Sequence, residues 1–302
     1  MEASSRAEWP RKQRDIHNHH INSTVWDRFE FRDGDIVICT YAKSGTTWMQ
    51  QIVGQLIFAG ANDVNVGALS PWLDYRLLPT EVLDGLASQT HRRFVKSHLP
   101  ADALVISPKA KYLYIGRDGR DTAWSLHNHY ANFSEDRRLA INEAPGLVGP
   151  PLPPCTVDVL QFYRTWFAEN GKPYWPFFEN IRSWWRLRDL PNVMLINFSE
   201  LKADLPGMIR KIAGFLDIDI DEGAFPRMVE HCSFEYMRDH GELVLARGGA
   251  SFRGGGKTFM HKGVNGRWRD ALTAHEVAAY EEKAVAELGA ECAAWLAGGE
   301  LG

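Results

Sequence analysis

The chain has 302 residues, 45% of them hydrophobic and 24% charged, and this composition excludes collagen-like, low-complexity and extended disordered proteins. Its 34 basic and 38 acidic residues give a net charge of −4, so the molecule as a whole does not attract nucleic acid or an anionic membrane. The cysteines are dispersed without a C-x-x-C pair, and the sequence has neither an apolar leader nor a membrane-length apolar run. We therefore expect a cytoplasmic, globular protein that binds neither nucleic acid nor membrane.

The predicted elements begin after an N-terminal arm, residues 1–30, and we expect residues 31–298 to form one domain. The apolar run Ile36–Tyr41 is typical of a buried parallel strand, and Gly45–Ala59 has the apolar spacing of a helix. Further strands and helices alternate along the chain: strands at Arg93–Lys96, Tyr112–Gly116 and Val193–Phe198, and helices at Asp121–Phe133, Val157–Glu169, Phe177–Leu187 and Leu205–Leu216. This alternation predicts an α/β fold: a single P-loop-like domain whose central, mostly parallel sheet is flanked by helices on both faces.

Two segments lack the pattern of regular structure. Ser134–Cys155 is rich in proline, and Ala246–Lys257 is rich in glycine and basic residues. Both are predicted to be mobile surface loops, and long loops in compact domains often cover a site. For the first segment, a plain connector is the alternative.

The turn Tyr41–Trp48 between the first strand and helix has the residues of an anion site. A small-residue turn that opens a helix presents free backbone N–H groups and the helix dipole to one point, which suits a phosphate. Lys43 precedes Gly45, whereas in the Walker P-loop the lysine follows the last glycine, so an ordinary ATPase or GTPase is disfavoured. The alternative to an anion site is a chance helix start with a capping Ser or Thr.

The next strand delivers Lys96 and His98 to the same edge of the sheet. Because the carboxyl ends of parallel strands share one crevice, we expect both residues near Lys43. A lone histidine is more often structural, but the neighbouring lysine and the anion loop favour a catalytic role here.

A second anion site is predicted from the strand that ends at Arg117. Ser125 follows two helical turns later, and the basic stretch Phe259–Arg269 follows the glycine-rich segment. Two anion sites in one molecule indicate a ligand with phosphates at both ends.

At these segments the chain resembles the cytosolic sulfotransferase family, which moves a sulfuryl group from 3′-phosphoadenosine 5′-phosphosulfate (PAPS) to an acceptor hydroxyl or amine. Residues 41–48, YAKSGTTW, resemble the family's YPKSGTTW loop, and residues 94–100, FVKSHLP, resemble its K-[ST]-H-L-P segment. Residues 117–125, RDGRDTAWS, match its R-x-x-x-D-x-x-x-S pattern, and residues 261–268, HKGVNGRW, resemble its R-K-G-x-x-G-x-W element.

The resemblance implies a PAPS-dependent transferase without a metal, in which His98 is the general base and Lys43 and Lys96 supply positive charge to the transferred group. It also implies the residues that bind the donor: Lys43, Ser44, Gly45, Thr46, Thr47 and Trp48 around the 5′-phosphosulfate; Arg117, Ser125, His261, Lys262 and Gly263 around the 3′-phosphate; and Ser233, Phe234, Met237 and Met260 beside the adenosine.

Some positions differ from the family pattern. His261 replaces an arginine, which removes one charged hydrogen bond to the 3′-phosphate unless Arg253 or Arg267 compensates. Phe198 replaces a tyrosine, and Cys232 replaces a threonine. The family's dimer motif is only partly visible, so a homodimer is left open.

The 11 Trp, 15 Phe and 9 Tyr residues favour an apolar acceptor pocket or a heavy core. The expected partner is a small-molecule acceptor such as a phenol, a sterol-like alcohol, an amine, a lipid or a natural-product scaffold. The histidines of His17–His20 are expected on a solvated arm rather than at a metal. The pocket candidates come from loops near the crevice: Trp72, Tyr75, Phe133, Tyr174, Trp175 and Phe252.

Two alternatives to the transferase remain at this point. One is a P-loop-type kinase that uses ATP, which the missing lysine after Gly45 and the second phosphate site disfavour. The other is a nucleotide-binding module that has lost catalysis, which the replacement at His261 leaves open.

Overall fold

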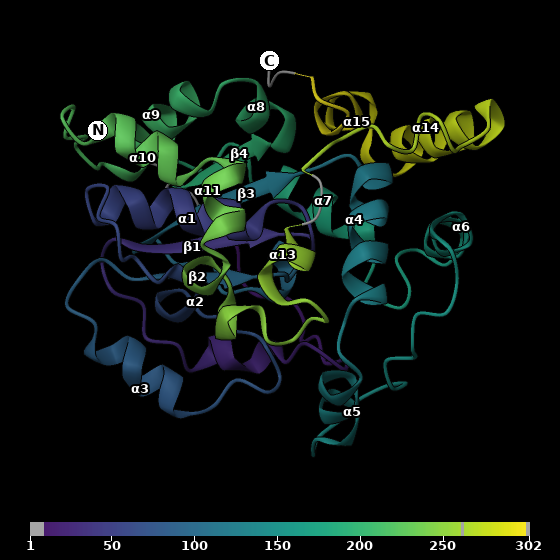
Figure 1. Ribbon diagram of the computed structural model, residues 1–302, viewed down its shortest axis with the longest axis horizontal. Coiled ribbons are helices and arrows are strands. Elements are labelled where there is room, and N and C mark those ends of the chain that lie inside the picture. The colour runs from purple at the N-terminus through teal and green to yellow at the C-terminus, as the bar shows by residue number, and fades with distance from the viewer. Residues whose placement is uncertain (1–8, 261–262, 300–302) are drawn as a thin grey trace, which may run out of the picture.

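The computed structural model describes residues 9–260 and 263–299. Within them lies a sheet of four parallel strands in the order β2-β1-β3-β4 (Figure 1). In the centre of the sheet, Ile38 of β1 lies opposite Lys96 of β2 and Leu113 of β3, so the carboxyl ends of these strands meet at one edge. The strands are β1 Asp35–Thr40, β2 Phe94–Ser97, β3 Ala110–Gly116 and β4 Val193–Asn197.

Helices connect the strands and cover both faces of the sheet (Figure 1). The 3₁₀ helices are η1 Ser23–Asp27, η2 Ala101–Ala103 and η3 Ala246–Gly249. The α-helices are α1 Thr46–Ile57, α2 Val66–Leu69, α3 Glu81–Ser88, α4 Gly119–Ala131, α5 Glu135–Glu143, α6 Val159–Ala168, α7 Phe177–Trp185, α8 Phe198–Ala203, α9 Leu205–Leu216, α10 Phe225–His231, α11 Phe234–Asp239, α12 Gly241–Val244, α13 Gly255–Phe259, α14 Ala274–Leu288 and α15 Ala290–Leu296.

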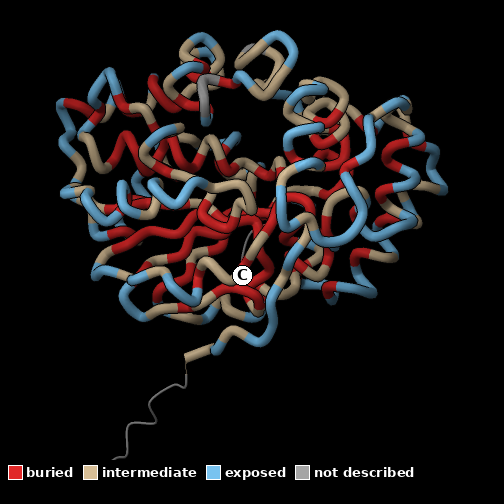
Figure 2. The backbone as a smooth tube through the Cα atoms, turned by 90° about the horizontal axis from the view of Figure 1, so that it is seen from below, coloured by how far each residue is buried: buried red, intermediate tan, exposed pale blue. Residues whose placement is uncertain are grey.

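The strands are buried on both faces because helices cover both sides of the sheet. Successive side chains of a strand point to opposite faces, so each strand contributes to two separate cores. Ile36 and Ile38 of β1 pack into a mainly aliphatic core with α1 and α9, whereas Val37 and Cys39 pack into a second core on the other face. Figure 2 shows these buried strands in the middle of the molecule with exposed segments around them. The predicted fold is confirmed, and much of the aromatic content lies in the second core, including the fully buried Trp26, Trp166, Trp184 and Trp295.

Several predicted helix and strand bounds differ by one to two residues from those observed, and the following differences have a clear structural reason. β4 ends at Asn197, because the Asn197 side chain accepts a hydrogen bond from the Ser199 N–H and caps α8, which makes Phe198 helical. The segment Ser134–Cys155 is not simply a loop, since the Ser134 hydroxyl caps α5. The segment Ala246–Lys257 likewise contains η3 and the start of α13.

The described part of the N-terminal arm packs against the rest of the chain. Ile21 and Trp26 are each 1% exposed, and the Trp26 indole N–H donates to Asp74 at 3.3 Å. His19 and His20 are each 6% exposed, so the expectation of a solvated arm is wrong for these two residues. That residues 31–298 form one domain stays a prediction. No helix within the described residues has the length and apolar character needed to cross a bilayer.

Candidate active site

The turn between β1 and α1 forms a cradle at the start of a twelve-residue helix. Gly45, with φ +109°, lies in a conformation that disfavours a side chain, and a Cβ there would lie 2.9 Å from the Phe198 ring. Thr46 begins α1, and its hydroxyl lies 2.6 Å from that of Thr40. The first backbone N–H groups of α1 have no partner within the helix, so the turn offers donors to an anion.

Lys43 and Lys96 are half-buried beside this turn. Burial, followed by the positive charges of Arg117 and Lys96, lowers the pKa of Lys43 to about 7. Its Nζ atom lies 3.5 Å from the centroid of the Phe259 ring. Burial also lowers the pKa of Lys96 to about 8, although Asp74 opposes this shift. Cations gathered in this way repel one another, and an anionic ligand would relieve that repulsion.

His98 lies at the end of β2, where its ring is fixed by one strong acceptor. Its Nδ1 atom is 2.9 Å from the Thr40 carbonyl oxygen, which can only accept, so Nδ1 carries the proton and Nε2 is left as an acceptor. The His98 ring centroid lies 4.8 Å from that of Trp72 and 5.9 Å from that of Trp175. Burial lowers the pKa of His98 to about 3, and the charges of Lys96 and Lys43 act in the same direction.

Arg117 joins the anion loop to the segment near the end of the chain. Its guanidinium donates to the Lys43 carbonyl oxygen at 2.9 Å and to Asn265 Oδ1 at 2.8 Å, and it lies 4.3 Å above the Phe198 ring. Burial lowers the pKa of Arg117 to about 10. Its buried Nε–H has no partner among the described residues, which suits a site that receives an anion.

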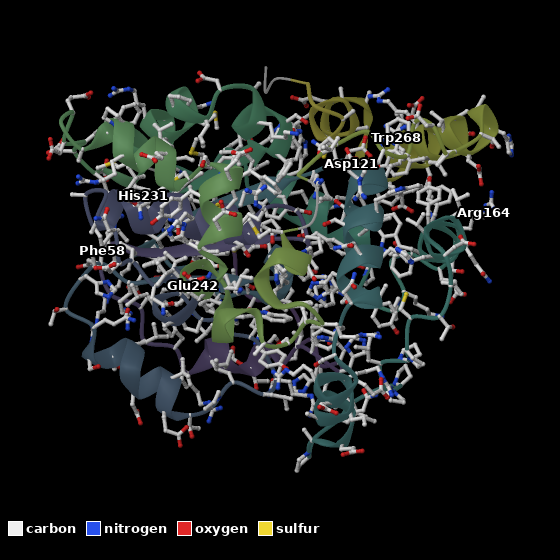
Figure 3. All side chains as sticks on the ribbon, viewed as in Figure 1. Phe58, Asp121, Arg164, His231, Glu242 and Trp268 are labelled. Atoms are coloured by element: carbon white, nitrogen blue, oxygen red, sulfur yellow. The ribbon has the colours of Figure 1, made fainter. Side chains whose placement is uncertain are left out.

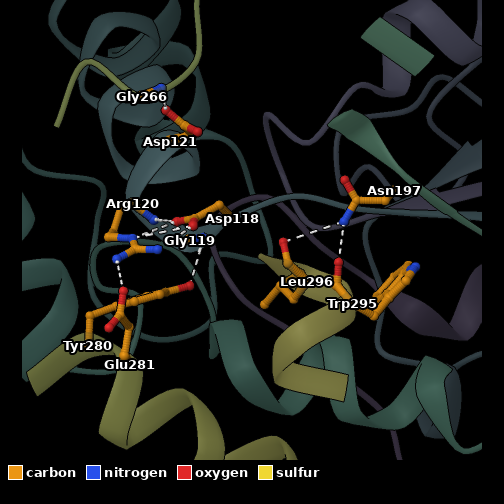
Figure 4. A network of polar contacts seen from close by, with 10 residues as sticks. All are labelled: Asp118, Gly119, Arg120, Asp121, Asn197, Gly266, Tyr280, Glu281, Trp295 and Leu296. Atoms are coloured by element: carbon orange, nitrogen blue, oxygen red, sulfur yellow. Dashed lines mark hydrogen bonds and ion pairs between the residues drawn. The ribbon is translucent and has the colours of Figure 1, made fainter. Parts of the chain in front are cut away.

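The segment around Gly266 is held against α4. The Gly266 N–H donates to Asp121 Oδ1 at 2.7 Å (Figure 4). Arg120, paired with Asp118, lies 3.8 Å from the Trp268 ring, and Figure 3 shows Trp268 beside the upper end of α4. These contacts bring residues that are far apart in the sequence to one side of the site.

On the side of the site away from α4, the cavity is lined by apolar side chains that include Trp48, Phe234 and Met237. The Trp48 indole N–H donates to the Cys232 carbonyl oxygen at 2.8 Å, which fixes α1 against α10. Gly263 has φ +61°, and a Cβ there would lie 2.8 Å from the Phe234 ring, so this close approach requires glycine. The Lys202 ammonium donates to the Gly263 carbonyl oxygen at 2.8 Å.

One cavity of about 810 Å³ unites most of the predicted site residues. Ser44 and Ser233 do not line it. The Ser44 Oγ atom is buried without a partner in the described part of the chain, and the Ser233 hydroxyl caps α11. His261 and Lys262 lie outside the described residues. The cavity is lined by Lys43, Gly45, Thr46, Thr47, Trp48, Lys96, His98, Arg117, Ser125, Phe234, Met237, Met260 and Gly263, and by all six aromatic candidates, Trp72, Tyr75, Phe133, Tyr174, Trp175 and Phe252.

Other lining residues were not predicted. Asn128 and His129 follow Ser125 by three and four positions on α4, so helical spacing could have found them. His20 comes from the N-terminal arm, for which the sequence offered no signal. Of the two arginines considered as replacements at the 3′-phosphate site, Arg267 lines the cavity, whereas Arg253 is exposed and does not.

Acidic, histidine and cysteine side chains are the usual protein ligands of a metal ion, and three histidines, His20, His98 and His129, line this cavity. Within residues 9–260 and 263–299, no group of three such side chains could hold a metal ion.

Known proteins resemble this chain in sequence and in architecture. The family described as a sulfotransferase domain matches residues 33–289. The chain is 30% identical over 274 residues to a glycolipid sulfotransferase of Mycobacterium bovis, covering 83% of this chain and 84% of the relative. It is 31% identical over 288 residues to sulfotransferase 1B1 of Mus musculus, covering 88% of each. Mouse sulfotransferase SULT7A1 complexed with PAP has the same fold, with a TM-score of 0.69 at 23% identity over 90% of this chain and 91% of that one.

Proposed function

Because the chain belongs to the sulfotransferase family, as the match over residues 33–289 shows, we propose that it moves a sulfuryl group from PAPS to a hydroxyl or amine of a small apolar or aromatic acceptor. The observation that carries this proposal is that Lys43, Lys96, Arg117 and His98, whose Nε2 atom is unprotonated, all line one cavity. Such a site suits an anionic donor that reacts next to a general base.

The donor site fits a nucleotide with phosphates at both ends. The cradle of Thr46 and Gly45, with Lys43, is expected to take the 5′-phosphosulfate. Arg117 lies two residues before α4 and Ser125 lies within that helix, and both are expected to bind the 3′-phosphate. The mouse structural neighbour was solved with PAP, the product that PAPS leaves after transfer, which supports the same ligand here.

The reaction follows from the position of His98. The acceptor oxygen or nitrogen forms a bond to sulfur while the bond from sulfur to the 5′-phosphate oxygen breaks in line with it, and the acceptor proton moves to Nε2 of His98. Lys43 and Lys96 stabilise the negative charge that grows on the sulfuryl and phosphate oxygens. No metal is required in this scheme.

Burial is the main cause of the low pKa of His98, about 3, and the positive charges of Lys96 and Lys43 lower it further. A bound phosphosulfate would oppose the charges of Lys43 and Lys96 and so raise the proton affinity of His98. Donor binding therefore prepares the base for its task.

The acceptor is expected to lie among aromatic rings. Trp72 and Trp175 flank His98, and Tyr75, Tyr174, Phe133 and Phe252 continue the wall of the cavity. The name of the mycobacterial relative gives a glycolipid as its acceptor, which supports a hydrophobic acceptor here. The four cysteines form no disulfide, which suits the reducing cytoplasm as the place of action.

The test is an assay with PAPS or ATP and a panel of phenols, alcohols and amines, with EDTA and without magnesium. We expect release of the bisphosphate product and sulfated acceptor from PAPS only. Transfer from ATP alone, or tight binding of PAPS without transfer to any acceptor, would contradict the proposal.

A further inference from the structure

Arg137 places a positive charge in the part of the cavity that aromatic side chains otherwise line. It belongs to α5, which lies below α4 in Figure 1. Its Nη2 atom donates to the Tyr75 hydroxyl at 2.6 Å, and its guanidinium carbon lies 5.4 Å from the centroid of the Tyr75 ring. The charge is thus held at a defined place on the cavity wall.

A continuous wall of rings joins this charge to the general base. The His98 and Trp72 rings lie 4.8 Å apart, and the Trp72 and Tyr75 rings are stacked at 5.0 Å. The Trp72 indole N–H donates to Asp74 Oδ2 at 2.9 Å, which fixes the first of these rings. An acceptor lying along this wall would have its reacting group at His98 and its opposite end at Arg137.

Arg137 has no carboxylate partner within the described residues. The neighbouring Arg138, in contrast, pairs with Glu135 on the same helix. A guanidinium on an apolar wall is well placed to bind a carboxylate through two parallel N–H···O bonds. Because residues 9–260 and 263–299 supply no such group, this position is open to a ligand.

The nearby histidine, His20, does not compete for the same role. Burial holds the pKa of His20 well below its usual range, and the charge of Arg137 acts in the same direction, so His20 is neutral at pH 7. Its ring lies 6.0 Å from Trp72 and 6.3 Å from Tyr75. Arg137 is therefore the charge that an acceptor meets there.

The helix that carries Arg137 is anchored at both ends. The Ser134 hydroxyl accepts from the Arg137 N–H at the start of α5. At the other end, the Arg76 guanidinium donates to the carbonyl oxygens of Ala144 and Pro145 at 3.2 and 2.9 Å, and also to that of Ile141. A charge on an anchored helix can select a substrate, since its position costs little to fix on binding.

We propose that the natural acceptor carries an anionic group, in the simplest case a carboxylate, at the end opposite the hydroxyl or amine that receives the sulfuryl group. Arg137 binds this anionic group, and the rings of Trp72 and Tyr75 contact the apolar part between the two ends. This inference rests on the proposed function and specifies its substrate class.

The test compares acceptors that differ only in charge: 4-hydroxyphenyl alkanoic acids of increasing chain length and the matching amides. We expect the wild-type protein to favour the acid by on the order of 10- to 100-fold in kcat/KM at the best chain length, as a charge-assisted hydrogen bond allows. In Arg137→Gln the ratio of acid to amide should fall toward one, Arg137→Lys should keep part of it, and Arg137→Glu should reverse it.

Arg164→Gln is the matched control, because this arginine lies on α6 with its side chain 57% exposed and at the edge of the molecule in Figure 3. It should keep the wild-type ratio. Equal kcat/KM for acids and amides at every chain length, or an unchanged ratio in Arg137→Gln, would overturn the inference. Tryptophan fluorescence measures the binding of acid and amide to the protein that already holds the bisphosphate, and it gives the ratio of their affinities without turnover. If transfer fails while this binding preference is present, the result counts against the proposed function alone.

Discussion

His98 illustrates what the sequence could and could not predict about a single residue. Its place at the carboxyl end of β2 followed from the parallel sheet, and the structure puts it in the same cavity as Lys43. Its low pKa could not be predicted, because the burial comes from Trp72 and Trp175, which lie on segments distant from His98 and from each other in the sequence.

We predict that His98→Ala lowers turnover by about 10²- to 10⁴-fold, the range expected when a general base is lost. Binding of the bisphosphate product should persist, since we assign the anion site to Lys43, Arg117 and the start of α1, which this substitution leaves unchanged. Steady-state kinetics and calorimetry on the same preparation measure the two effects. Activity within tenfold of the wild type would argue against His98 as the base.

We predict that Lys43 makes donor binding sensitive to pH. Its pKa is about 7 before an anion binds, so it loses its proton as pH rises through 7, and an anion raises this pKa by favouring the charged form. The protein should therefore take up roughly one proton when the bisphosphate binds at pH 8. The affinity for the bisphosphate should fall from pH 6 to pH 9.

Calorimetry of bisphosphate binding in two buffers with different ionisation enthalpies measures this uptake. Lys43→Gln should bind more weakly and take up less, with the remainder due to Lys96, whose pKa is about 8. Uptake that is equal in the variant and the wild type would show that another group titrates.

Among the elements, the β1–α1 turn depends on glycine at one position. Gly45→Ala would combine φ +109° with a Cβ 2.9 Å from the Phe198 ring. We expect a loss of about 1–3 kcal/mol in the free energy of unfolding, because such a backbone conformation is costly for a residue with a side chain. Bisphosphate binding should weaken as well, since the cradle shifts. Chemical denaturation and calorimetry measure the two changes.

Gly85→Ala on α3 is the control, because a Cβ at that position meets nothing within 4 Å. In the interior of a helix this change should stabilise the protein by about 0.5–1 kcal/mol. If Gly45→Ala were as stable as the wild type, the turn would have room that the distances exclude.

Elements with strong periodicity were predictable, whereas those that depend on local capping were not. α9 was predicted at Leu205–Leu216, its observed bounds, from an amphipathic pattern with a proline in the first turn. α5 was missed because its residues are mostly polar and its helix depends on the Ser134 cap and the anchoring by Arg76. The burial of His19 was equally hidden, since its ring contacts the carbonyl oxygen of Pro173, 154 positions away.

At the scale of the whole molecule, the net charge of −4 hides a strongly positive site. The proposed anion site involves residues on or next to β1, β3, α1, α4 and the segment after α13, so we expect a ligand in it to stabilise most of the fold at once. The bisphosphate at about 100 times its Kd should add about 2.7 kcal/mol to the free energy of unfolding and raise Tm by roughly 5 °C.

Thermal denaturation with bisphosphate or with adenosine 5′-monophosphate checks this expectation. The monophosphate should raise Tm less, because it leaves Arg117 without its phosphate, and Arg117→Gln should bring the two ligands closer together. Arg164→Gln should respond like the wild type. An equal rise with both ligands in the wild type would contradict a separate 3′-phosphate site.

The two halves of the cavity come from different kinds of structure. Lys43, Lys96 and Arg117 lie on the strands or directly after them, whereas the aromatic rings and Arg137 come from segments outside the sheet. Substitutions in those segments leave the strand hydrogen bonds intact. Mutations in these segments can therefore change which acceptor is bound while the donor site stays the same. A combinatorial library confined to residues 72–82 and 133–141 is an economical starting point for directed evolution of acceptor choice.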